Sequence, residues 1–138
     1  MSSTVLVAVA LVQHGHDSEG QPLYVVTKRL KGAHLGGAWE LPGGKVEADE
    51  LAERAVVREL KEELGVEVTN VRPMTFSHYA YPTKTVLLLF FEAHTTSNSP
   101  EPKPLASDAL RLMTADELLT LPMPPANEPL RLMLQTRA

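Results

Sequence analysis

The segment Leu51–Leu64 constrains the fold of this chain more than any other. It contains neither glycine nor proline, and Gly65 stands where a left-handed helix cap belongs, so the segment predicts a helix. At about 100° per residue, its apolar side chains sweep an arc of roughly 240°. Three glutamates, Glu59, Glu62 and Glu63, fall inside this arc within about 100° of one another. The helix is therefore expected to pack against the protein with carboxylates on its packed side.

Carboxylates in this position need compensation. They repel one another at helical spacing, they lie in the last turns, where the helix dipole disfavours negative charge, and packing removes their water. A divalent cation would relieve all three penalties, and carboxylate oxygens suit Mg²⁺ or Mn²⁺. The chain has no cysteine, so any metal must be held by oxygen or imidazole. The alternative is a solvated acidic face, which is the usual explanation of a glutamate-rich helix.

The remaining pattern predicts a mixed α/β protein. Val5–Val12 is an uninterrupted apolar run typical of a strand buried on both faces, and it is far shorter than the roughly 20 residues of a membrane helix. The order of predicted strands and helices indicates a mixed sheet flanked by helices, in the α/β or α+β class. Further strands are predicted at Leu23–Lys28, Arg72–Tyr81, Thr85–Ala93 and Ala109–Met113.

Turn and cap signals join these elements. Pro42-Gly43-Gly44 predicts a sharp turn, and Thr95–Pro104 predicts a polar, flexible surface loop. Thr114 and Glu117 have the spacing of a capping box that opens a short helix. A last helix is predicted from Asn127 to the end, with a proline in its first turn, where the missing N–H costs little.

Length and charge limit the functions that are expected. A length of 138 residues predicts one domain, residues 1–138. The net charge of −4 leaves no basic stripe that could neutralise a nucleic-acid polymer. With no membrane-length segment and no basic leader, we expect a cytoplasmic protein without a membrane partner. A monomer and a homodimer are both open at this level. Eight of the seventeen acidic residues lie between Glu47 and Glu67, so chemistry is expected there.

The spacing around the predicted helix resembles the Nudix box. Gly44 is followed by five residues and then Glu50, and seven further residues lead to Arg58-Glu59-Leu60. Lys61-Glu62-Glu63-Leu64-Gly65-Val66 follows directly. Every specified position of the family pattern is matched, which by chance would happen on the order of once in ten million chains of this length. The chain is therefore similar to the Nudix hydrolase superfamily.

This resemblance implies a Nudix fold, with a mixed sheet sandwiched between helices, and hydrolysis of a nucleoside diphosphate linked to another group. Glu59, Glu62 and Glu63, with the carbonyl of Gly43, would bind Mg²⁺ or, in its place, Mn²⁺. Arg58 would orient a glutamate through a salt bridge. The general base would be Glu62 or Glu63, between which spacing does not decide. The resemblance gives structural roles in the box to Gly44, Glu50 and Gly65.

Most of the chain resembles the MutT branch, whose bacterial members convert 8-oxo-dGTP to the monophosphate and pyrophosphate. The likeness extends from Thr27 through Gly44, including His34, and returns in Pro124–Pro129. The resemblance implies that Asn127 hydrogen-bonds the purine edge, because its amide offers both a donor and an acceptor. The other substrate contacts that it implies are Arg29, Glu40, Leu41, the ring of Tyr81, and Lys84, which stands where the branch has an arginine.

Several alternatives stay open at this level. A capping role is the alternative for Asn127, and Trp39 is given no role. The substrate could instead be CTP or a modified pyrimidine triphosphate, or the chain could be a non-catalytic nucleotide-binding module. The branch's additional metal-binding loop glutamate has no counterpart in Leu105–Ala109, so Asp108, Glu101 or water would take its place.

Overall fold

The computed structural model describes residues 3–33 and 36–138, and each predicted strand and helix is present. Its strands are β1 (Thr4–His16), β2 (Pro22–Lys28), β3 (Trp39–Glu40), β4 (Gly43–Lys45), β5 (Val68–Ala80), β6 (Thr85–Thr95) and β7 (Ala109–Met113). Its helices are α1 (Ala52–Leu64), α2 (Ala115–Leu119) and α3 (Glu128–Gln135), preceded by the 3-10 turn η1 (Pro125–Asn127). Two short strands, β3 and β4, were not predicted.

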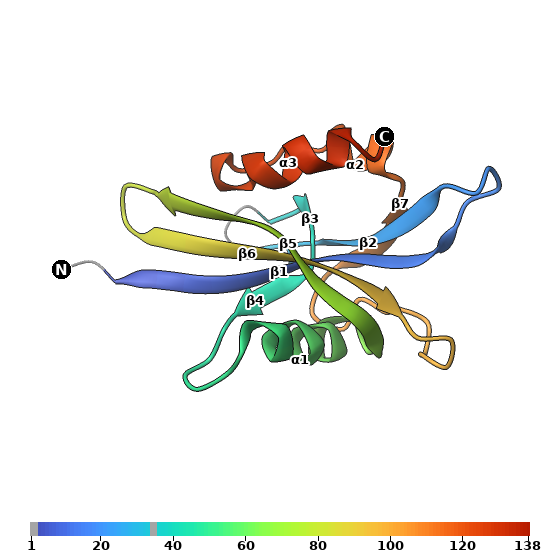
Figure 1. Ribbon diagram of the computed structural model, residues 1–138, viewed down its shortest axis with the longest axis horizontal. Coiled ribbons are helices and arrows are strands. Elements are labelled where there is room, and N and C mark those ends of the chain that lie inside the picture. Colours follow the sequence, from blue (N-terminus) through green and yellow to red (C-terminus); the bar gives the residue numbers. More distant parts are fainter. Residues whose placement is uncertain (1–2, 34–35) are drawn as a thin grey trace.

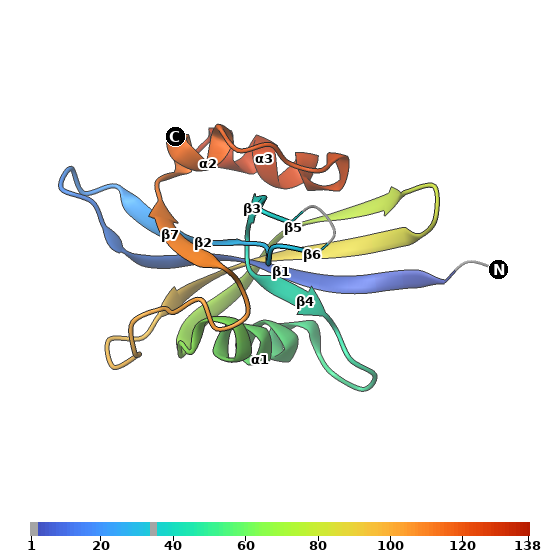
Figure 2. The ribbon, with the colours of Figure 1, turned by 180° about the vertical axis from the view of Figure 1, so that it is seen from behind.

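A mixed sheet lies between two layers of helices (Figure 1). Its main path runs β3-β2-β1-β6-β5, while β4 pairs with β1 and β7 pairs with β2. β1 is parallel to β6 and antiparallel to β2 and β4. α1 covers one face of the sheet, and α2 and α3 cover the other, as the view from behind confirms (Figure 2). The predicted fold class, a mixed sheet between helices, is therefore confirmed.

The central strand β1 supplies side chains to both cores. Ala8, Ala10 and Val12 pack in the core beneath α1, whereas Leu11 packs in the core beneath α2 and α3. All four side chains are at most 1% exposed, as expected of a strand buried on both faces. The side chains of the two alanines are small, so β1 contributes little side-chain bulk to the core beneath α1.

The predicted sharp turn at Pro42-Gly43-Gly44 is wrong. Gly43 and Gly44 belong to β4, where Gly43 lies opposite Val9 and Gly44 opposite Ala8. A Cβ on Gly43 would collide with the carbonyl oxygen of Ala8 and lie 2.8 Å from the Cα of Val9. These glycines serve close packing of an extended segment, which a turn signal in the sequence does not distinguish from a change of direction.

The helix boundaries follow the predicted signals. Gly65 caps α1 in the left-handed conformation at φ 70°, and its N–H donates to the carbonyl of Lys61. Thr114 and Glu117 form the capping box of α2, each side chain accepting from the other residue's N–H. α3 begins after η1 with a proline in its first turn. Within residues 3–33 and 36–138, no helix has both the length and the apolar character needed to cross a membrane.

Candidate active site

The packing of α1 against β4 brings Glu59 and Glu63 to two glycines. The N–H of Gly43 donates to Oε2 of Glu63 at 3.1 Å. A Cβ on Gly44 would lie 2.5 Å from Cδ and Oε1 of Glu59, closer than packed carbon and oxygen atoms approach. Position 44 must therefore lack a side chain for the Glu59 carboxylate to lie where it does.

Arg58 holds several of the acidic side chains in one network. Its Nε and Nη2 donate to the two carboxylate oxygens of Glu50 at 2.7 and 2.9 Å. Its Nη1 donates to Glu59 at 2.9 Å and to Glu62 at 3.3 Å, and Nη2 also donates to the carbonyl of Lys45. The bond from Arg58, and then the N–H of Glu47, lower the pKa of Glu50 to about 2. The guanidinium thus orients the acids and ties α1 to β4.

Glu63 is the member of the trio whose charge is least compensated. Burial, followed by the charge of Glu59, raises its pKa to about 7; the charges of Glu40 and Glu62 add to the shift, and the hydrogen bond from Gly43 opposes it. The side chain of Glu59 is 15% exposed and that of Glu62 is 59% exposed. Glu59 and Glu63 therefore lie on the protein side of α1, while Glu62 lies at the rim.

The acidic group fits a hard dication. Among the residues that the structure describes, no three His, Asp or Glu side chains are gathered as a ready metal cage. Arg58 and the N–H of Gly43 instead engage the carboxylates one by one. All the side-chain donors are carboxylate oxygens, and the raised pKa of Glu63, caused first by burial and then by the charge of Glu59, reports negative charge that the bond from Gly43 compensates only in part. Oxygen donors and uncompensated charge are the conditions that suit Mg²⁺ or Mn²⁺.

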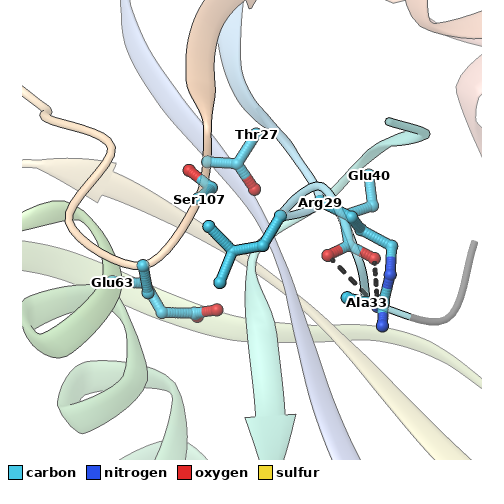
Figure 3. A pocket seen from close by; sticks show the side chains of 8 residues that line it. Thr27, Arg29, Ala33, Glu40, Glu63 and Ser107 are labelled. Carbon is cyan, nitrogen blue, oxygen red and sulfur yellow. Dashed lines mark hydrogen bonds and ion pairs between the residues drawn. The ribbon is translucent and has the colours of Figure 1, made fainter. Parts of the chain in front are cut away.

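A small hollow lies beside this acidic group, and we call it the Glu63 hollow (Figure 3). Its volume is about 140 Å³. In the close view, Glu63 extends from α1 toward the space, and Arg29 and Glu40 form its far side. The Nη1 of Arg29 donates to Oε2 of Glu40 at 3.1 Å, which fixes these two side chains against each other. The wall is completed by Thr27, Leu30, Ala33, Ala106 and Ser107.

A second hollow of about 300 Å³ shares Arg29 and Glu40 with the first, and we call it the Asn127 hollow. It is bounded by β1, β6, the β5–β6 connection and η1. All six side chains that the resemblance implies for substrate contact line it: Arg29, Glu40, Leu41, Tyr81, Lys84 and Asn127. Apolar side chains supply much of the remaining wall, among them Val7, Val9, Val86 and Leu88. An apolar space with a few polar groups is typical of a small-molecule site.

The segment that carries Asn127 is attached to the opposite wall of this hollow. The N–H of Ala126 donates to the hydroxyl of Tyr81 at 3.4 Å, and the rings of Tyr79 and Tyr81 lie 4.8 Å apart. Asn127 stands at the N-cap position of α3, but its side chain makes no cap hydrogen bond. The capping role that was open for Asn127 is therefore not the one that its side chain performs.

Neither acidic candidate for the additional loop glutamate lines the Glu63 hollow. Glu101 instead pairs with Nε2 of His14 at 2.9 Å, and the other ring nitrogen of His14 bonds to Thr95. Asp108 accepts a hydrogen bond from the N–H of Lys31 at 2.7 Å. Ala106 and Ser107 occupy the wall instead, so neither Asp108 nor Glu101 replaces the missing glutamate in this arrangement.

Sequence reasoning missed several residues of the two hollows. Thr27, Ala33 and Ser107 carry no motif, and only the tertiary structure brings them beside Glu63. Trp39, for which the sequence indicates no role, packs at the edge of the core under α2 and α3, and the guanidinium of Arg111 lies 4.7 Å from its ring centre. His34, which belongs to the stretch of resemblance, lies outside the described residues.

Comparisons with known proteins agree with this geometry. Residues 5–134 match the model of the NUDIX domain. The 8-oxo-dGTP diphosphatase of Escherichia coli (strain K12) is 35% identical over 107 residues, which cover 75% of this chain and 79% of that protein. The CTP pyrophosphohydrolase of the same organism is 38% identical over 98 residues, which cover 68% of each chain. Two relatives named for different substrates are thus similar to this chain.

The fold comparison covers nearly the whole chain. The solution structure of the E. coli ORF135 protein superposes with a TM-score of 0.77 at 26% identity, over 98% of this chain and 91% of that one. The sequence alignments are shorter. This chain spans 61%, 79% and 48% of the first three curated relatives, all named 8-oxo-dGTP diphosphatase.

Proposed function

The chain belongs to the NUDIX domain family and within it to the Nudix hydrolases, and from this premise we propose that it converts nucleoside triphosphates to monophosphate and pyrophosphate with Mg²⁺. The proposed preferred substrate is 8-oxo-dGTP, which the enzyme would remove from the nucleotide pool. Because that pool lies in the cytoplasm, the cytoplasm is the compartment that we propose.

One observation carries this proposal. The Asn127 hollow and the Glu63 hollow share Arg29 and Glu40 in their walls, so a largely apolar space and a space lined by Glu63 lie next to the same two side chains. A base held beside Asn127 would have its phosphates directed past Arg29 toward Glu63. A nucleoside triphosphate has this polarity, with an apolar ring at one end and phosphate charge at the other.

Each group beside these hollows has a proposed task. Glu59, Glu62 and Glu63, with the carbonyl of Gly43, would hold Mg²⁺, which supplies charge neutralisation for the phosphate oxygens. Arg29 would pair with phosphate, exchanging its contact with Glu40 for a stronger one. A glutamate would take the proton of the attacking water as general base. Glu62 and Glu63 are the two candidates for that base.

A nucleotide panel tests the proposed substrate. We expect kcat/KM for 8-oxo-dGTP to exceed that for dGTP by on the order of a hundredfold, because a hydrogen-bonding site penalises a base that leaves its groups unpaired. Pyrophosphate and monophosphate should be the two products, identified by chromatography. If the wild-type protein hydrolysed no nucleotide in Mg²⁺, the binding-module alternative would replace this proposal.

A pyrimidine triphosphatase is the second candidate, and it is favoured by the similarity to a protein named CTP pyrophosphohydrolase. Lys84 is relevant to this alternative, because an ammonium group contacts a base as a point charge and does not offer the paired donors of a guanidinium. Including CTP and 5-substituted dCTP in the same panel separates the two candidates. A higher kcat/KM for either of them than for 8-oxo-dGTP would decide for the pyrimidine substrate.

The general base can be identified with two variants. Glu62→Gln and Glu63→Gln each keep the size of the side chain while removing its charge. If the replaced glutamate is the base, kcat of the variant should fall by about 10²–10⁴-fold while its Mg²⁺ affinity is retained. If the replaced glutamate is only a metal ligand, the Mg²⁺ affinity of the variant should fall as well. Steady-state kinetics and Mg²⁺ titration calorimetry give the two readouts. Normal hydrolysis by both variants would remove both residues from the mechanism.

Asn127→Ala tests recognition of the base. We expect the preference for 8-oxo-dGTP over dGTP to fall by about tenfold or more, with a smaller loss of dGTP hydrolysis, since only the base edge loses its partner. Asn98→Ala is the matched control, because Asn98 lies exposed in the connection between β6 and β7. An unchanged substrate preference in Asn127→Ala would show that this amide does not read the base.

A further inference from the structure

A short segment, Leu105–Asp108, is hydrogen-bonded at one end to α1 and at the other to β2 and to the turn formed by residues 29–33. At its start, the N–H of Leu105 donates to the carbonyl of Glu63 at 3.0 Å. At its end, the N–H of Asp108 donates to the carbonyl of Lys28 at 3.0 Å, and the Asp108 carboxylate accepts from the N–H of Lys31 at 2.7 Å. The segment is therefore attached at one end to the helix with the acids and at the other to β2 and the turn.

The two residues between these attachments line the Glu63 hollow. Ala106 and Ser107 belong to its lining, as do Leu30 and Ala33 of the turn. The bonds from Ala33 N–H to Leu30 and from Gly37 N–H to Arg29 run between residues of the same connection between β2 and β3. The Asp108 carboxylate differs from these, because it bonds the turn to a segment more than seventy residues away, at a sequence separation of 77.

We propose that Asp108 is a positioning residue that sets the width of the Glu63 hollow. Its carboxylate holds the turn at residues 29–33 against the segment with Ala106 and Ser107. Arg29 lines both hollows and bonds to Glu40, and it is the first residue of this turn, directly after the end of β2. Asp108 itself lines neither hollow, so it acts through the placement of Arg29 and Leu30 and not by contact with substrate.

The geometry of the bond explains why an acid is suited to this position. A carboxylate that accepts from a backbone N–H makes a charge-assisted bond, which is shorter and stronger than a neutral one. The 2.7 Å length is in that class. By this bond, Asp108 restrains the turn at residues 29–33 before any ligand binds. A turn that is already ordered loses less conformational entropy when a ligand binds beside it. This inference rests on the proposed function for its kinetic consequence, but its structural part does not.

Two variants at position 108 separate the tether from the charge. Asp108→Ala removes the acceptor, whereas Asp108→Asn keeps an amide oxygen that can accept from Lys31. We expect Asp108→Ala to raise KM for the best nucleotide by about tenfold with kcat changed less than about twofold, and Asp108→Asn to restore most of KM. The matched control is Asp17→Ala, since Asp17 similarly accepts from the N–H groups of Glu19 and Gln21, in the β1–β2 connection.

Amide hydrogen exchange by NMR tests the tether without any substrate. In the full chain, the Lys31 amide should exchange about tenfold faster or more in Asp108→Ala, near the wild-type rate in Asp108→Asn, and at the wild-type rate in Asp17→Ala. An unchanged Lys31 rate in Asp108→Ala would overturn the inference, whatever the kinetics. A faster Lys31 amide with unchanged KM would also overturn it, because the turn would then not shape the site.

Failure of the proposed function has a different signature. If the wild-type protein hydrolysed no nucleotide, the exchange rates would still decide whether Asp108 holds the turn. Conversely, normal selectivity for 8-oxo-dGTP together with an unchanged Lys31 amide would leave the proposed function intact and reject the role of Asp108.

Discussion

At the scale of single residues, the absence of a side chain matters as much as the acids themselves. Gly44 leaves the space that the Glu59 carboxylate occupies, and Gly43 supplies the N–H that orients Glu63. Neither role is a matter of turn formation, because both glycines lie in an extended strand. A glycine pair can thus serve packing against an acid and not a change in chain direction.

Gly44→Ala is expected to disable the site while the protein stays folded. The added methyl would overlap the Glu59 carboxylate, which must then move away from the other acids. We predict a loss of kcat/KM of about 10–100-fold and weaker Mg²⁺ binding, as for other substitutions of residues that position a metal ligand without binding the metal. Kinetics and calorimetry measure the two effects. Gly20→Ala is the control for a general loss of stability, since its Cβ would meet nothing within 4 Å but alanine is strained at the φ of 82° found there; equal losses in both variants would refute a site-specific effect.

The raised pKa of Glu63 predicts how stability changes with pH when Mg²⁺ is removed. With a pKa of about 7 in the folded protein and 4.5 as the reference, the folded state binds the proton more tightly than the unfolded state. The free energy of unfolding should therefore fall as pH rises from 4.5 to 7 and change no further above it. Glu63→Gln lacks this titration, so its stability relative to wild type should improve toward high pH.

Urea denaturation in EDTA at pH 5 and pH 8 measures this effect. The difference in unfolding free energy between Glu63→Gln and wild type should shift by about 1–2 kcal/mol in favour of the variant at pH 8, after allowance for solvent screening of a partly exposed group. A difference that is the same at both pH values would mean that the carboxyl titrates near its ordinary pKa in the folded protein.

Among the helices and strands, α1 is held in place by two kinds of contact: apolar packing against the sheet and the hydrogen bonds of Arg58. Ala55, Val56, Leu60 and Leu64 pack beneath the sheet, while Arg58 ties the polar face to Glu50 and to the carbonyl of Lys45. The apolar side of the helix determines which way it faces. The arginine determines where the connection between β4 and α1 lies relative to the acids.

Arg58→Lys tests this second role. An ammonium group cannot reproduce the two parallel bonds to Glu50, so the urea midpoint should fall and kcat/KM should drop by about 10–100-fold. Glu50 has a pKa lowered to about 2, so its contribution to stability is present above pH 4.5 and is lost as pH falls toward 2. The difference between variant and wild type should accordingly shrink over that range, and a constant difference would contradict the assignment.

At the scale of the whole molecule, the site exists because three separated parts of the chain meet. α1 supplies the acids, the connection between β2 and β3 supplies Arg29, β3 supplies Glu40, and η1 brings Asn127 to the far end. No one of these parts contains both the acidic group and the apolar space. Ligand binding should consequently be coupled to the stability of the entire fold.

Mg²⁺ should stabilise the folded protein. Glu59 and Glu63 lie beside Gly44 and Gly43 only when α1 is packed, so the ion should bind the folded state in preference to the unfolded one. An Mg²⁺ concentration of about 100 times the dissociation constant would then add about 2.7 kcal/mol to the free energy of unfolding. For a chain of this size that corresponds to an increase in melting temperature of roughly 5–10 °C. Differential scanning calorimetry with Mg²⁺ or EDTA measures it. The double variant Glu59→Gln, Glu63→Gln should show no increase, and an equal increase there would place the ion elsewhere.

Much of the fold could be read from local signals. The caps at Gly65 and Thr114 act within a few residues of their helices, so the sequence predicted these helix ends correctly. The strands are longer at several ends than predicted; β5, for example, begins at Val68 and not at Arg72. Pairing with β6 explains this difference, because the partner strand continues opposite Val68 at Thr95.

Spacing along one segment was enough to predict the family, the acidic helix and its packed face, because each of these depends on residues only a few positions apart. The folded chain was needed to show that Gly43 and Gly44 form a strand, that Asp108 bonds to Lys31, and that Arg29 lines two hollows. Those features arise from contacts between segments distant in the chain, and local spacing carries no information about such contacts.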